Sequence, residues 1–574
     1  MKYSSIPAAR SIVHHCKVKG IVNIIISPGS RNAPLTIGFT TDPFFKCYSI
    51  VDERCAAFFA LGISQQLHQP VAVLCTSGSA LLNYYPAVAE AFYSDIPLVV
   101  ISADRPSYKV DVGDGQTIRQ QGVFERHIGY SANLKQDVEH AKESIRGLQG
   151  TQSEVQLYND GELNRALNTA LETRCPVHIN VPFEEPLYET VQQGTVHPKM
   201  VPPVNIRTSG INELSHFASH WNSAGKKMIL VGTNPPDTVD QALLDVLAGD
   251  PSVLIFTETT SNIHHPKCFS SIDSIIAPIE KSARKTEDFK ALQPEILLTF
   301  GGMIVSKKIK AFLRNYPPGQ HWHVDSKKAY DTFFRLSHHF KTHFNLFLQE
   351  FIPLTKEVES NYQEYWKGRR ERYIQKRAIY LKEIPFTDLQ AFGAIMNGIP
   401  KGYQVQLANS STVRYAQLFE MDASHKVFCN RGTSGIDGST STAIGASLYE
   451  PAPTLLLTGD LSFIYDSNGL WNNYLRPDFR IIVINNGGGG IFRILPGREE
   501  TQNFRDYFET VQDLEIDKLC SLYGIAHSRA TDMESLTLAL SSFYAESETP
   551  KLLEVSTPRL INDKILLAYF DFIS

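Results

Sequence analysis

The sequence predicts an α/β fold made of three parallel-sheet domains. Short apolar runs of strand length alternate with helical stretches from residue 21 to 190, again from 228 to 325, and a third time from about 386 to the end. Repeated alternation of this kind produces parallel sheets that are covered by helices on both faces. A proline-containing segment and a charged, tyrosine-rich segment separate the three series. The length of 574 residues is enough for three or four domains.

The two separating segments divide the chain into four predicted parts. Residues 200–204 carry paired prolines, which resist both helix and central strand, so we expect a first domain over 1–192 and a central α/β domain over 205–350. A helical connector is predicted over 351–385, and a third α/β domain over 386–574. The predicted strands are 22–27, 48–52, 71–76, 98–102 and 177–181 in the first domain, and 228–231, 253–257, 296–300 and 321–325 in the central one.

Composition excludes several classes of partner. A hydrophobic content of 43% and a charged content of 20% are ordinary for globular domains with filled cores. A net charge of −5 without a basic run argues against nucleic acid. The sequence has no 18-residue apolar stretch and no signal-like N-terminal segment, so no stable membrane insertion is expected. Its eight cysteines are scattered without a Cys-x-x-Cys pair, which is typical of a reducing cytoplasm.

Two apolar runs near the C-terminal end each stop at an oxygen-bearing side chain. One run ends at Asp460 and the next at Asn486, 26 positions later. That spacing fits a strand–helix–strand crossover, which places both side chains at the carboxyl edge of a parallel sheet, where ligands bind. A carboxylate, an amide oxygen and a carbonyl of the glycine loop 487–490 form a hard-oxygen set suited to Mg²⁺. The glycines would let the backbone approach a diphosphate.

This pattern resembles that of thiamine-diphosphate enzymes, in which Gly-Asp is followed by a paired asparagine. The alternative is an ordinary buried strand–helix–strand unit with a glycine-rich loop, which Gly459-Asp460 alone would favour. The second strand, the pair Asn485-Asn486 and the four glycines together favour the cofactor site.

Glu53 stands where thiamine chemistry requires a carboxylic acid. The run 48–62 predicts a strand that breaks at Asp52-Glu53 into an apolar helix. A carboxyl group facing the cofactor's pyrimidine ring would hydrogen-bond the ring nitrogen, so that the cofactor relays acid–base catalysis. By itself, Asp52-Glu53-Arg54 would suit a solvated helix start, where acids are favoured by the helix dipole. Together with the C-terminal diphosphate motif, however, the pattern favours a catalytic role for Glu53.

Basic groups gather after several predicted strands. Arg31 follows the first strand in Ser-Pro-Gly-Ser-Arg, and Arg105 follows another in Ala-Asp-Arg-Pro, with Gln116 and Arg119 shortly after. The third segment adds Arg414 and Arg431. Any one arginine is more simply a salt-bridge residue, but several at strand ends suggest bidentate recognition of carboxylates. We therefore expect an acidic substrate.

Together these blocks closely resemble the family of 2-succinyl-5-enolpyruvyl-6-hydroxy-3-cyclohexene-1-carboxylate synthases, thiamine enzymes of menaquinone biosynthesis. The resemblance covers nearly the whole chain. It implies a PYR-like first domain, a central domain and a PP-like third domain, with the active site between two subunits of a homodimer or homotetramer. The blocks that carry it are Ser-Pro-Gly-Ser-Arg (27–31), Asp-Glu-Arg (52–54), Thr-Ser-Gly-Ser-Ala (76–80), Ala-Asp-Arg-Pro (103–106), Ser-Gly-Ile-Asp-Gly (434–438), Gly-Asp-Leu-Ser (459–462) and Gly-Gly-Ile-Phe (489–492).

The resemblance implies decarboxylation of 2-oxoglutarate and conjugate addition of the succinyl carbanion to isochorismate, with thiamine diphosphate and Mg²⁺ or Mn²⁺. It makes Glu53 the catalytic residue. The implied metal ligands are Asp460, Asn486 and the Gly488 carbonyl. The implied cofactor-binding residues are Glu53, Ile436, Asp460, Leu461, Ser462, Asn486, Gly488, Gly489, Ile491 and Phe492. The implied substrate-binding residues are Ser30, Arg31, Arg105, Gln116, Lys307, Lys308, Ser410, Arg414 and Arg431.

Two positions depart from relatives and two other functions stay open. Some relatives have Arg at Lys308, which leaves a bidentate contact there in doubt, and Gly487 stands where many have Asn or Asp. A different thiamine decarboxylase or carboligase, such as an acetolactate-synthase-like enzyme, would share the metal motif but should lack the arginines. A non-catalytic cofactor-binding module should have lost Glu53 or the metal pair. No Gly-x-Gly-x-x-Gly, P-loop or Gly-x-Ser-x-Gly element suggests a nucleotide enzyme or a hydrolase.

Overall fold

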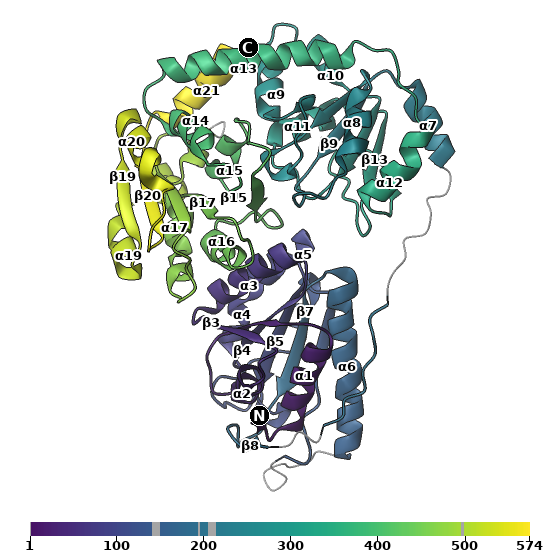
Figure 1. Cartoon of the computed structure of the whole chain (residues 1–574), viewed down its shortest axis with the longest axis vertical. Coiled ribbons are helices and arrows are strands. Elements are labelled where there is room, and N and C mark those ends of the chain that lie inside the picture. The colour runs from purple at the N-terminus through teal and green to yellow at the C-terminus, as the bar shows by residue number, and fades with distance from the viewer. Residues whose placement is uncertain (1, 141–149, 193–195, 205–213, 495–498) are drawn as a thin grey trace. The chain divides into compact units, whose positions relative to one another are not determined.

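Three six-stranded sheets, in each of which every strand pair is parallel, form the framework of the computed structural model (Figure 1). The structure describes residues 2–140, 150–192, 196–204, 214–494 and 499–574. The α/β class with three parallel-sheet domains is therefore confirmed. Parallel strands that are covered on both faces must be apolar along their whole length, which is why the strand signal was strong in this sequence.

The first sheet has the strand order β3–β2–β4–β5–β7–β6. Its strands are β2 (Asn23–Ile26), β3 (Lys46–Ser49), β4 (Val71–Cys75), β5 (Leu98–Asp104), β6 (Tyr130–Asn133) and β7 (Val177–Pro182). Its helices are α1 (Pro7–Val18), α2 (Ala33–Thr41), α3 (Glu53–Leu67), α4 (Ser79–Asn83), α5 (Tyr85–Ser94) and α6 (Gln152–Thr173). A separate antiparallel pair joins β1 (Tyr3–Ser4) to β8 (Thr190–Val191). β3 ends earlier than predicted, and β6 was not predicted because Tyr-Ser-Ala-Asn is not an apolar run.

The central sheet has the order β11–β10–β9–β12–β13–β14. Its strands are β9 (Lys227–Val231), β10 (Val253–Phe256), β11 (Cys268–Phe269), β12 (Ile296–Phe300), β13 (Gln320–Val324) and β14 (Leu336–Phe340). Its helices are α7 (Leu214–Ser223), α8 (Gln241–Gly249), α9 (Ile272–Lys281), α10 (Lys285–Leu292), α11 (Lys307–Asn315) and α12 (Phe344–Phe351). The edge strands β11 and β14 were not predicted. β14, Leu-Ser-His-His-Phe, is half polar because it lies at an edge.

The third sheet has the order β16–β15–β17–β18–β20–β19. Its strands are β15 (Gln404–Leu407), β16 (Lys426–Cys429), β17 (Thr454–Gly459), β18 (Arg480–Asn485), β19 (Ala526–Ala530) and β20 (Lys551–Ser556). The helices of this segment are α14 (Asp388–Gly398), α15 (Ser411–Ala416), α16 (Ser439–Ser447), α17 (Asp460–Tyr465), α18 (Gln502–Phe504), α19 (Ile516–Tyr523), α20 (Met533–Phe543) and α21 (Asn562–Ile573). β17 and β18 are neighbours in register, with Gly459 opposite Ile484, so their carboxyl ends meet at one edge.

A long helix, α13 (Tyr362–Glu383), fills most of the predicted connector. It packs on α9 and β10 of the central segment and on α14 and α21 of the third (Figure 1). Tyr362, Trp366, Tyr373 and Tyr380 point into a continuous buried cluster that spans both segments, while the remaining face is charged. None of the helices that the structure describes is long and apolar enough to cross a membrane.

The internal contacts group the chain into two compact units. Unit 1 comprises Met1–Ile206, Gly432–Pro451 and Tyr465–Phe479, and unit 2 comprises Arg207–Arg431, Ala452–Ile464 and Arg480–Ser574. The central and third sheets thus share one unit, held by the cluster around α13. The four-part division predicted from the joints remains a prediction, since the helix α16 of the third segment belongs with the first sheet in unit 1.

Helices α3 and α16 pack backbone to backbone within unit 1. A Cβ atom at Gly62 would lie 2.0 Å from the carbonyl oxygen of Thr442, and one at Gly445 would lie 2.0 Å from that of Phe59. Only glycine fits at both crossing points. This close packing holds the helix whose first residue is Glu53.

Candidate active site

Glu53 opens α3, and the residues beside it hold the start of the helix in place. Asp52 is the N-cap, and its Oδ1 accepts a hydrogen bond from the Cys55 backbone N–H at 3.2 Å. Arg54 donates to the carbonyl oxygen of Tyr465 at 2.8 Å. The Glu53 carboxylate is half-buried and accepts a long hydrogen bond, 3.4 Å, from Asn83. Asp52-Glu53-Arg54 is therefore a true helix start, and its middle side chain stays available for chemistry.

Arg31 and Arg105 gather around a carboxylate of the chain itself, which sequence reasoning missed. Arg31 is 2% exposed, and it donates to the carbonyl of Phe183 and to Glu185 Oε1, both at 3.0 Å. Arg105 Nη1 lies 4.0 Å from the same Oε1 atom. Glu185 follows β7 and its side chain is 63% exposed. We call Arg31, Arg105 and Glu185 the first cluster. The pair Glu184-Glu185 directly after a predicted strand was the feature of the sequence that could have indicated this carboxylate.

A buried acid lies next to the first cluster. Asp104 is the last residue of β5 and is 7% exposed. Burial raises its pKa to about 6, and the nearby charge of Arg31 opposes that rise. Its Oδ2 accepts a hydrogen bond from Asn180 at 2.8 Å. Asp104 therefore adds a second acid beside Arg31, outside the first cluster itself.

Ser30 and Gln116, both predicted substrate residues, are exposed loop residues. Gln116 has a positive φ of 54°. A non-glycine residue in this region costs energy, which loops at binding sites tolerate more often than others. The buried glutamine of this loop is Gln120, whose Oε1 accepts from the Gly78 N–H at 2.9 Å and whose amide donates to Asn180 at 2.8 Å. Gln120 was missed, because nothing in its local sequence marks it.

Arg414 and Arg431 form a second cluster, in unit 2. Arg431 is 8% exposed and donates to Asn409 Oδ1 at 2.6 Å, while Arg414 donates to the Ser410 carbonyl at 2.6 Å. Burial lowers the pKa of Arg414, and the like charge of Arg431 lowers it further. Ser410 holds a positive φ of 68° where the chain turns into α15. Two guanidinium groups are thus held close together beside a strained turn.

Three lysines of α11 differ in their surroundings: the predicted Lys307 and Lys308, and Lys310, which was not predicted. Lys307 is exposed at the start of α11, and Lys308 bonds Glu280 at 2.5 Å. Lys310 is half-buried, and its pKa is lowered mainly by burial, with the charges of Arg431 and Arg414 lowering it further. Its position one turn along the helix gave no sequence signal, since only the Lys307-Lys308 pair matched the family pattern.

A buried glutamate supports the turn before these lysines. Glu258 is 5% exposed, and its two oxygens accept the backbone N–H groups of Val305 and Ser306 at 2.7 Å each. Burial raises its pKa to about 7, and the positive charge of Arg431 opposes the rise. Glu258 therefore ties the end of β10 to the N-terminus of α11 close to the second cluster.

Asp460 and Asn486 lie at the carboxyl ends of the adjacent strands β17 and β18. Asp460 is 3% exposed, and its Oδ2 accepts from the Gly488 N–H at 2.8 Å and from the Gln512 amide at 3.2 Å. Burial raises its pKa to about 6. The Asn486 amide donates to Asp388 at 2.9 Å, which aims its Oδ1 the other way. That Oδ1 atom is buried and accepts no hydrogen bond from the residues that the structure describes.

This arrangement fits Mg²⁺ or Mn²⁺. A buried amide oxygen without a donor costs free energy, and so does a buried carboxylate, and a hard cation would relieve both. Among the described parts of the chain, no group of three or more His, Cys, Asp or Glu side chains could hold a metal. The Gly488 carbonyl stays a prediction as the third protein ligand.

The loop 487–490 requires glycine for conformation and for space. Gly487 has φ of 76° and Gly488 of 141°. A Cβ atom at Gly488 would lie 2.7 Å from the carbonyl oxygen of Glu509. The four N–H groups of this loop donate to Asn485 Oδ1, to Asp460 Oδ2 and to the carbonyls of Glu509 and Gly488. A phosphate group could therefore bind these amides only by replacing one of these acceptors.

The remaining predicted cofactor residues are divided between the two units. Ser462 is buried in α17, and Leu461, Ile491 and Phe492 are half-buried in unit 2. Ile436 belongs to unit 1 and is 37% exposed, which is unusual for so apolar a side chain. An exposed isoleucine is consistent with the predicted apolar support for a cofactor, and the assignment stays a prediction.

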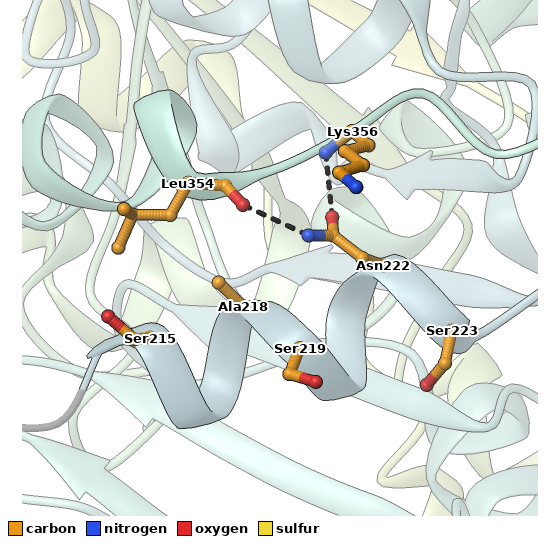
Figure 2. Close-up of a pocket in the computed structure, with 7 residues that line it drawn as sticks. All are labelled: Ser215, Ala218, Ser219, Asn222, Ser223, Leu354 and Lys356. Atoms are coloured by element: carbon orange, nitrogen blue, oxygen red, sulfur yellow. Dashed lines mark hydrogen bonds between the residues drawn. The ribbon is translucent and has the colours of Figure 1, made fainter.

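A hollow of about 350 Å³ lies elsewhere, on the central segment (Figure 2). Asn222 bridges its wall by donating to the Leu354 carbonyl at 3.0 Å and accepting from the Lys356 N–H at 2.6 Å. The other lining residues are Ser215, Ala218, Ser219 and Ser223. It contains none of the predicted site residues, and Lys356 is its one ionisable lining residue.

Comparison with known proteins identifies the family. Residues 6–129 match the family model "Thiamine pyrophosphate enzyme, N-terminal TPP binding domain", and residues 409–555 match the corresponding "C-terminal TPP binding domain". A relative named 2-succinyl-5-enolpyruvyl-6-hydroxy-3-cyclohexene-1-carboxylate synthase from Christiangramia forsetii is 56% identical over 100% of both chains. Relatives of the same name from Flavobacterium johnsoniae and Porphyromonas gingivalis are 53% identical (99% of each chain) and 38% identical (97% of this chain, 96% of the relative).

The chain belongs to the 2-succinyl-5-enolpyruvyl-6-hydroxy-3-cyclohexene-1-carboxylate synthase family. It is a thiamine-diphosphate-dependent enzyme, and the resemblance inferred from the sequence blocks is confirmed. Glu53, Arg31 and Arg105 fall in the N-terminal match, whereas Asp460 and Asn486 fall in the C-terminal one. Family membership favours the synthase over a non-catalytic module or an acetolactate-synthase-like enzyme.

Proposed function

We propose that this chain decarboxylates 2-oxoglutarate and joins the resulting succinyl unit to isochorismate by conjugate addition. The products are 2-succinyl-5-enolpyruvyl-6-hydroxy-3-cyclohexene-1-carboxylate and CO2, in menaquinone biosynthesis. The observation that carries the proposal is the match over the full length of both chains to relatives that bear the name of this synthase. Two separate arginine clusters support it, because both substrates are dicarboxylates.

The cofactor site is proposed at the carboxyl edge of the third sheet. The side-chain oxygens of Asp460 and Asn486 and the carbonyl of Gly488 would bind Mg²⁺ or Mn²⁺, which would hold the diphosphate of thiamine diphosphate. Bound there, the cofactor supplies an electron sink for breaking and forming the carbon–carbon bonds. The feature that supports this assignment most directly is the buried Oδ1 of Asn486, which accepts no hydrogen bond from the described residues.

Glu53 is the residue that would hold a proton shared with the cofactor's pyrimidine nitrogen. Its carboxylate is half-buried at a helix start where the Cys55 N–H donates to Asp52 and Arg54 donates to the Tyr465 carbonyl. A fixed backbone keeps an acid–base group within reach of its target, which such catalysis requires. Glutamine at this position would keep the size but could not exchange the proton.

The arginines would bind the substrate carboxylates and orient them. Planar guanidinium groups match carboxylates with two parallel hydrogen bonds. Each cluster is proposed to serve one substrate, with Ser30 and Gln116 beside the first cluster, and Ser410, Lys307 and Lys308 beside the second. The strained turn at Ser410 supports its place in a binding site.

We propose that the functional form is at least a homodimer whose cofactor sites lie between subunits. In that case Glu53 and Asp460 would serve one cofactor from different chains. Mixing inactive Glu53→Gln and Asp460→Ala subunits should then restore some activity through hybrid sites. A lack of complementation, with subunit exchange demonstrated by native mass spectrometry, would argue that each chain carries a complete site.

The test of the function is a product assay. The protein is mixed with thiamine diphosphate, Mg²⁺, 2-oxoglutarate and isochorismate, and the product is identified by mass. We expect the succinyl adduct together with CO2, and its absence with active, cofactor-loaded protein would refute the proposal. A parallel reaction with pyruvate distinguishes the acetolactate-synthase-like alternative, which would consume pyruvate without isochorismate.

A further inference from the structure

A buried ion triad lies beside the glycine loop. Glu509 is fully buried, and its carboxylate accepts from Arg493 Nε at 2.5 Å, from Arg493 Nη2 at 2.6 Å and from Arg559 Nη1 at 2.6 Å. The Arg493 side chain is 3% exposed. Charged groups are buried in this way only when they are paired and hydrogen-bonded, as these are. The triad therefore holds Glu509 firmly in one position.

Glu509 belongs to a segment, residues 505–512, that lies directly against the glycine loop. We call it the strap. Its Glu509 carbonyl accepts the Gly489 N–H at 2.6 Å, and the Gln512 amide reaches Asp460 Oδ2 at 3.2 Å. The Phe508 ring lies edge-on to Phe492, with centroids 6.3 Å apart. Gly488 has no room for a side chain because the Glu509 carbonyl occupies that space.

The strap has a strained backbone and little apolar support. Residues Arg505–Glu509 form a π-helix, a rare conformation that occurs often at functional sites, and Thr510 has a positive φ of 50°. Tyr507 is 78% exposed and Phe508 is 49% exposed, so apolar burial contributes little to holding the strap. The ion triad is then the main anchor within this part of the chain.

We propose that Glu509 is a positioning residue for the cofactor site: with Arg493 and Arg559 it clamps the strap onto the glycine loop. The clamp presets the backbone of residues 488 and 489 and the orientation of Asp460 for the metal-bound diphosphate. This inference rests on the proposed placement of the cofactor at that loop. The strap acts through its hydrogen bonds to Gly489 and to Asp460.

The test compares Glu509→Gln with Glu500→Gln. Both residues bond Arg493, but Glu500 does so at 2.7 Å with a side chain that is 60% exposed and outside the strap. Calorimetry gives the Kd of thiamine diphosphate in the presence of Mg²⁺, and hydrogen exchange reports protection of residues 487–490. We expect Glu509→Gln to weaken binding by about 10–100-fold, the usual cost of losing a residue that orients a metal site. Exchange at the glycine loop should increase in the same variant.

In Glu500→Gln the change should stay under about twofold, because exposed ion pairs contribute little. Unchanged cofactor affinity in folded Glu509→Gln would overturn the inference. Tighter binding would overturn it as well, since it would mean that the strap competes with the cofactor. If Glu509→Gln does not fold, Arg559→Met makes the same test, because that side chain is 29% exposed and its loss is better tolerated.

A further control separates this inference from the proposed cofactor site. Asp460→Ala should abolish diphosphate binding while leaving the weak binding of free thiamine unchanged. If the wild-type protein binds the cofactor and Asp460→Ala binds it equally well, the proposed site is wrong. If Asp460→Ala loses binding and Glu509→Gln does not, only the positioning role of Glu509 fails.

Discussion

The two arginine clusters differ in what their guanidinium groups already contact. In the first, Arg31 bonds the carboxylate of Glu185, and Arg105 lies 4.0 Å from the same oxygen. In the second, Arg414 bonds a backbone carbonyl and Arg431 bonds the amide oxygen of Asn409. A carboxylate offsets one positive charge, whereas neutral oxygens orient a guanidinium and leave its charge in place.

This difference indicates two ways to prepare a site for an anion. In the first cluster a carboxylate of the substrate must displace or join Glu185, whose side chain is 63% exposed. In the second, burial lowers the pKa of Arg414 and the like charge of Arg431 lowers it further, while the charge of Asp273 opposes the fall.

The largest expected effect is that of Glu53→Gln, which should slow the use of both substrates equally and so show no difference between the two arginine clusters. Glu53→Gln removes the proton-holding group that both substrates depend on. We expect cofactor affinity to be retained, while exchange of the cofactor's C2 proton, followed by NMR, falls about 10²–10⁴-fold. Turnover should fall equally whichever substrate is varied. Proton exchange at the wild-type rate would remove Glu53 from its assigned role.

A smaller effect concerns the buried acid beside the first cluster. The pKa of Asp104 is about 6, above that of an unfolded aspartate, so the native state takes up a proton first as the pH falls. Its contribution to stability therefore grows between pH 6 and about pH 4 and is lost as the pH rises again. Relative to Asp104→Asn, the wild-type free energy of unfolding should be roughly 1–3 kcal/mol larger at pH 4 than at pH 7, which means a more stable protein at pH 4. Denaturant unfolding at both pH values measures this, and a pH-independent gap would contradict it.

The smallest effect is that of Glu185→Gln, which tests directly whether Glu185 offsets the positive charge of the first cluster. Glu185→Gln removes the carboxylate that Arg31 bonds and leaves Asp104 as the acid beside the arginines, so a dicarboxylate should bind better there at low ionic strength. Because the side chain is largely exposed, kcat/KM should rise by no more than about fivefold, and salt should erase the gain. Glu189→Gln, an exposed substitution in the same loop, is the matched control. A fall in kcat/KM would mean that Glu185 orients Arg31 more than it shields it.

The fold was predictable because its buried strands are continuous apolar runs. Strands such as β4 and β5, buried along their whole length, stand out in any window of the sequence. The edge strands β6 and β14 did not, because one side of an edge strand meets solvent and needs no apolar residues. The grouping of α16 with the first sheet could not be predicted either, because it depends on glycine contacts between residues 62 and 442 that are far apart in sequence.

In the site, the sequence marks residues at strand ends and misses those that act from a distance. Asp460 and Asn486 were found because each ends an apolar run, and their adjacency follows from parallel pairing. Glu185 and Glu509 were missed, since their contacts with Arg31 and with the triad arginines come from tertiary packing. Lys310 was missed because the family pattern includes only the pair Lys307-Lys308, which precedes it on α11.

The central claim is that the two clusters hold different carboxylate substrates, and steady-state kinetics of Arg31→Met and Arg431→Met test it most directly. Losing one arginine of a buried carboxylate pair typically costs about 2–5 kcal/mol. We predict that each variant raises KM for one substrate, a different one in each case, while the Kd of thiamine diphosphate stays at the wild-type value. If both variants raise KM for the same substrate, or if both lose the cofactor, the division of the substrates between two clusters is wrong.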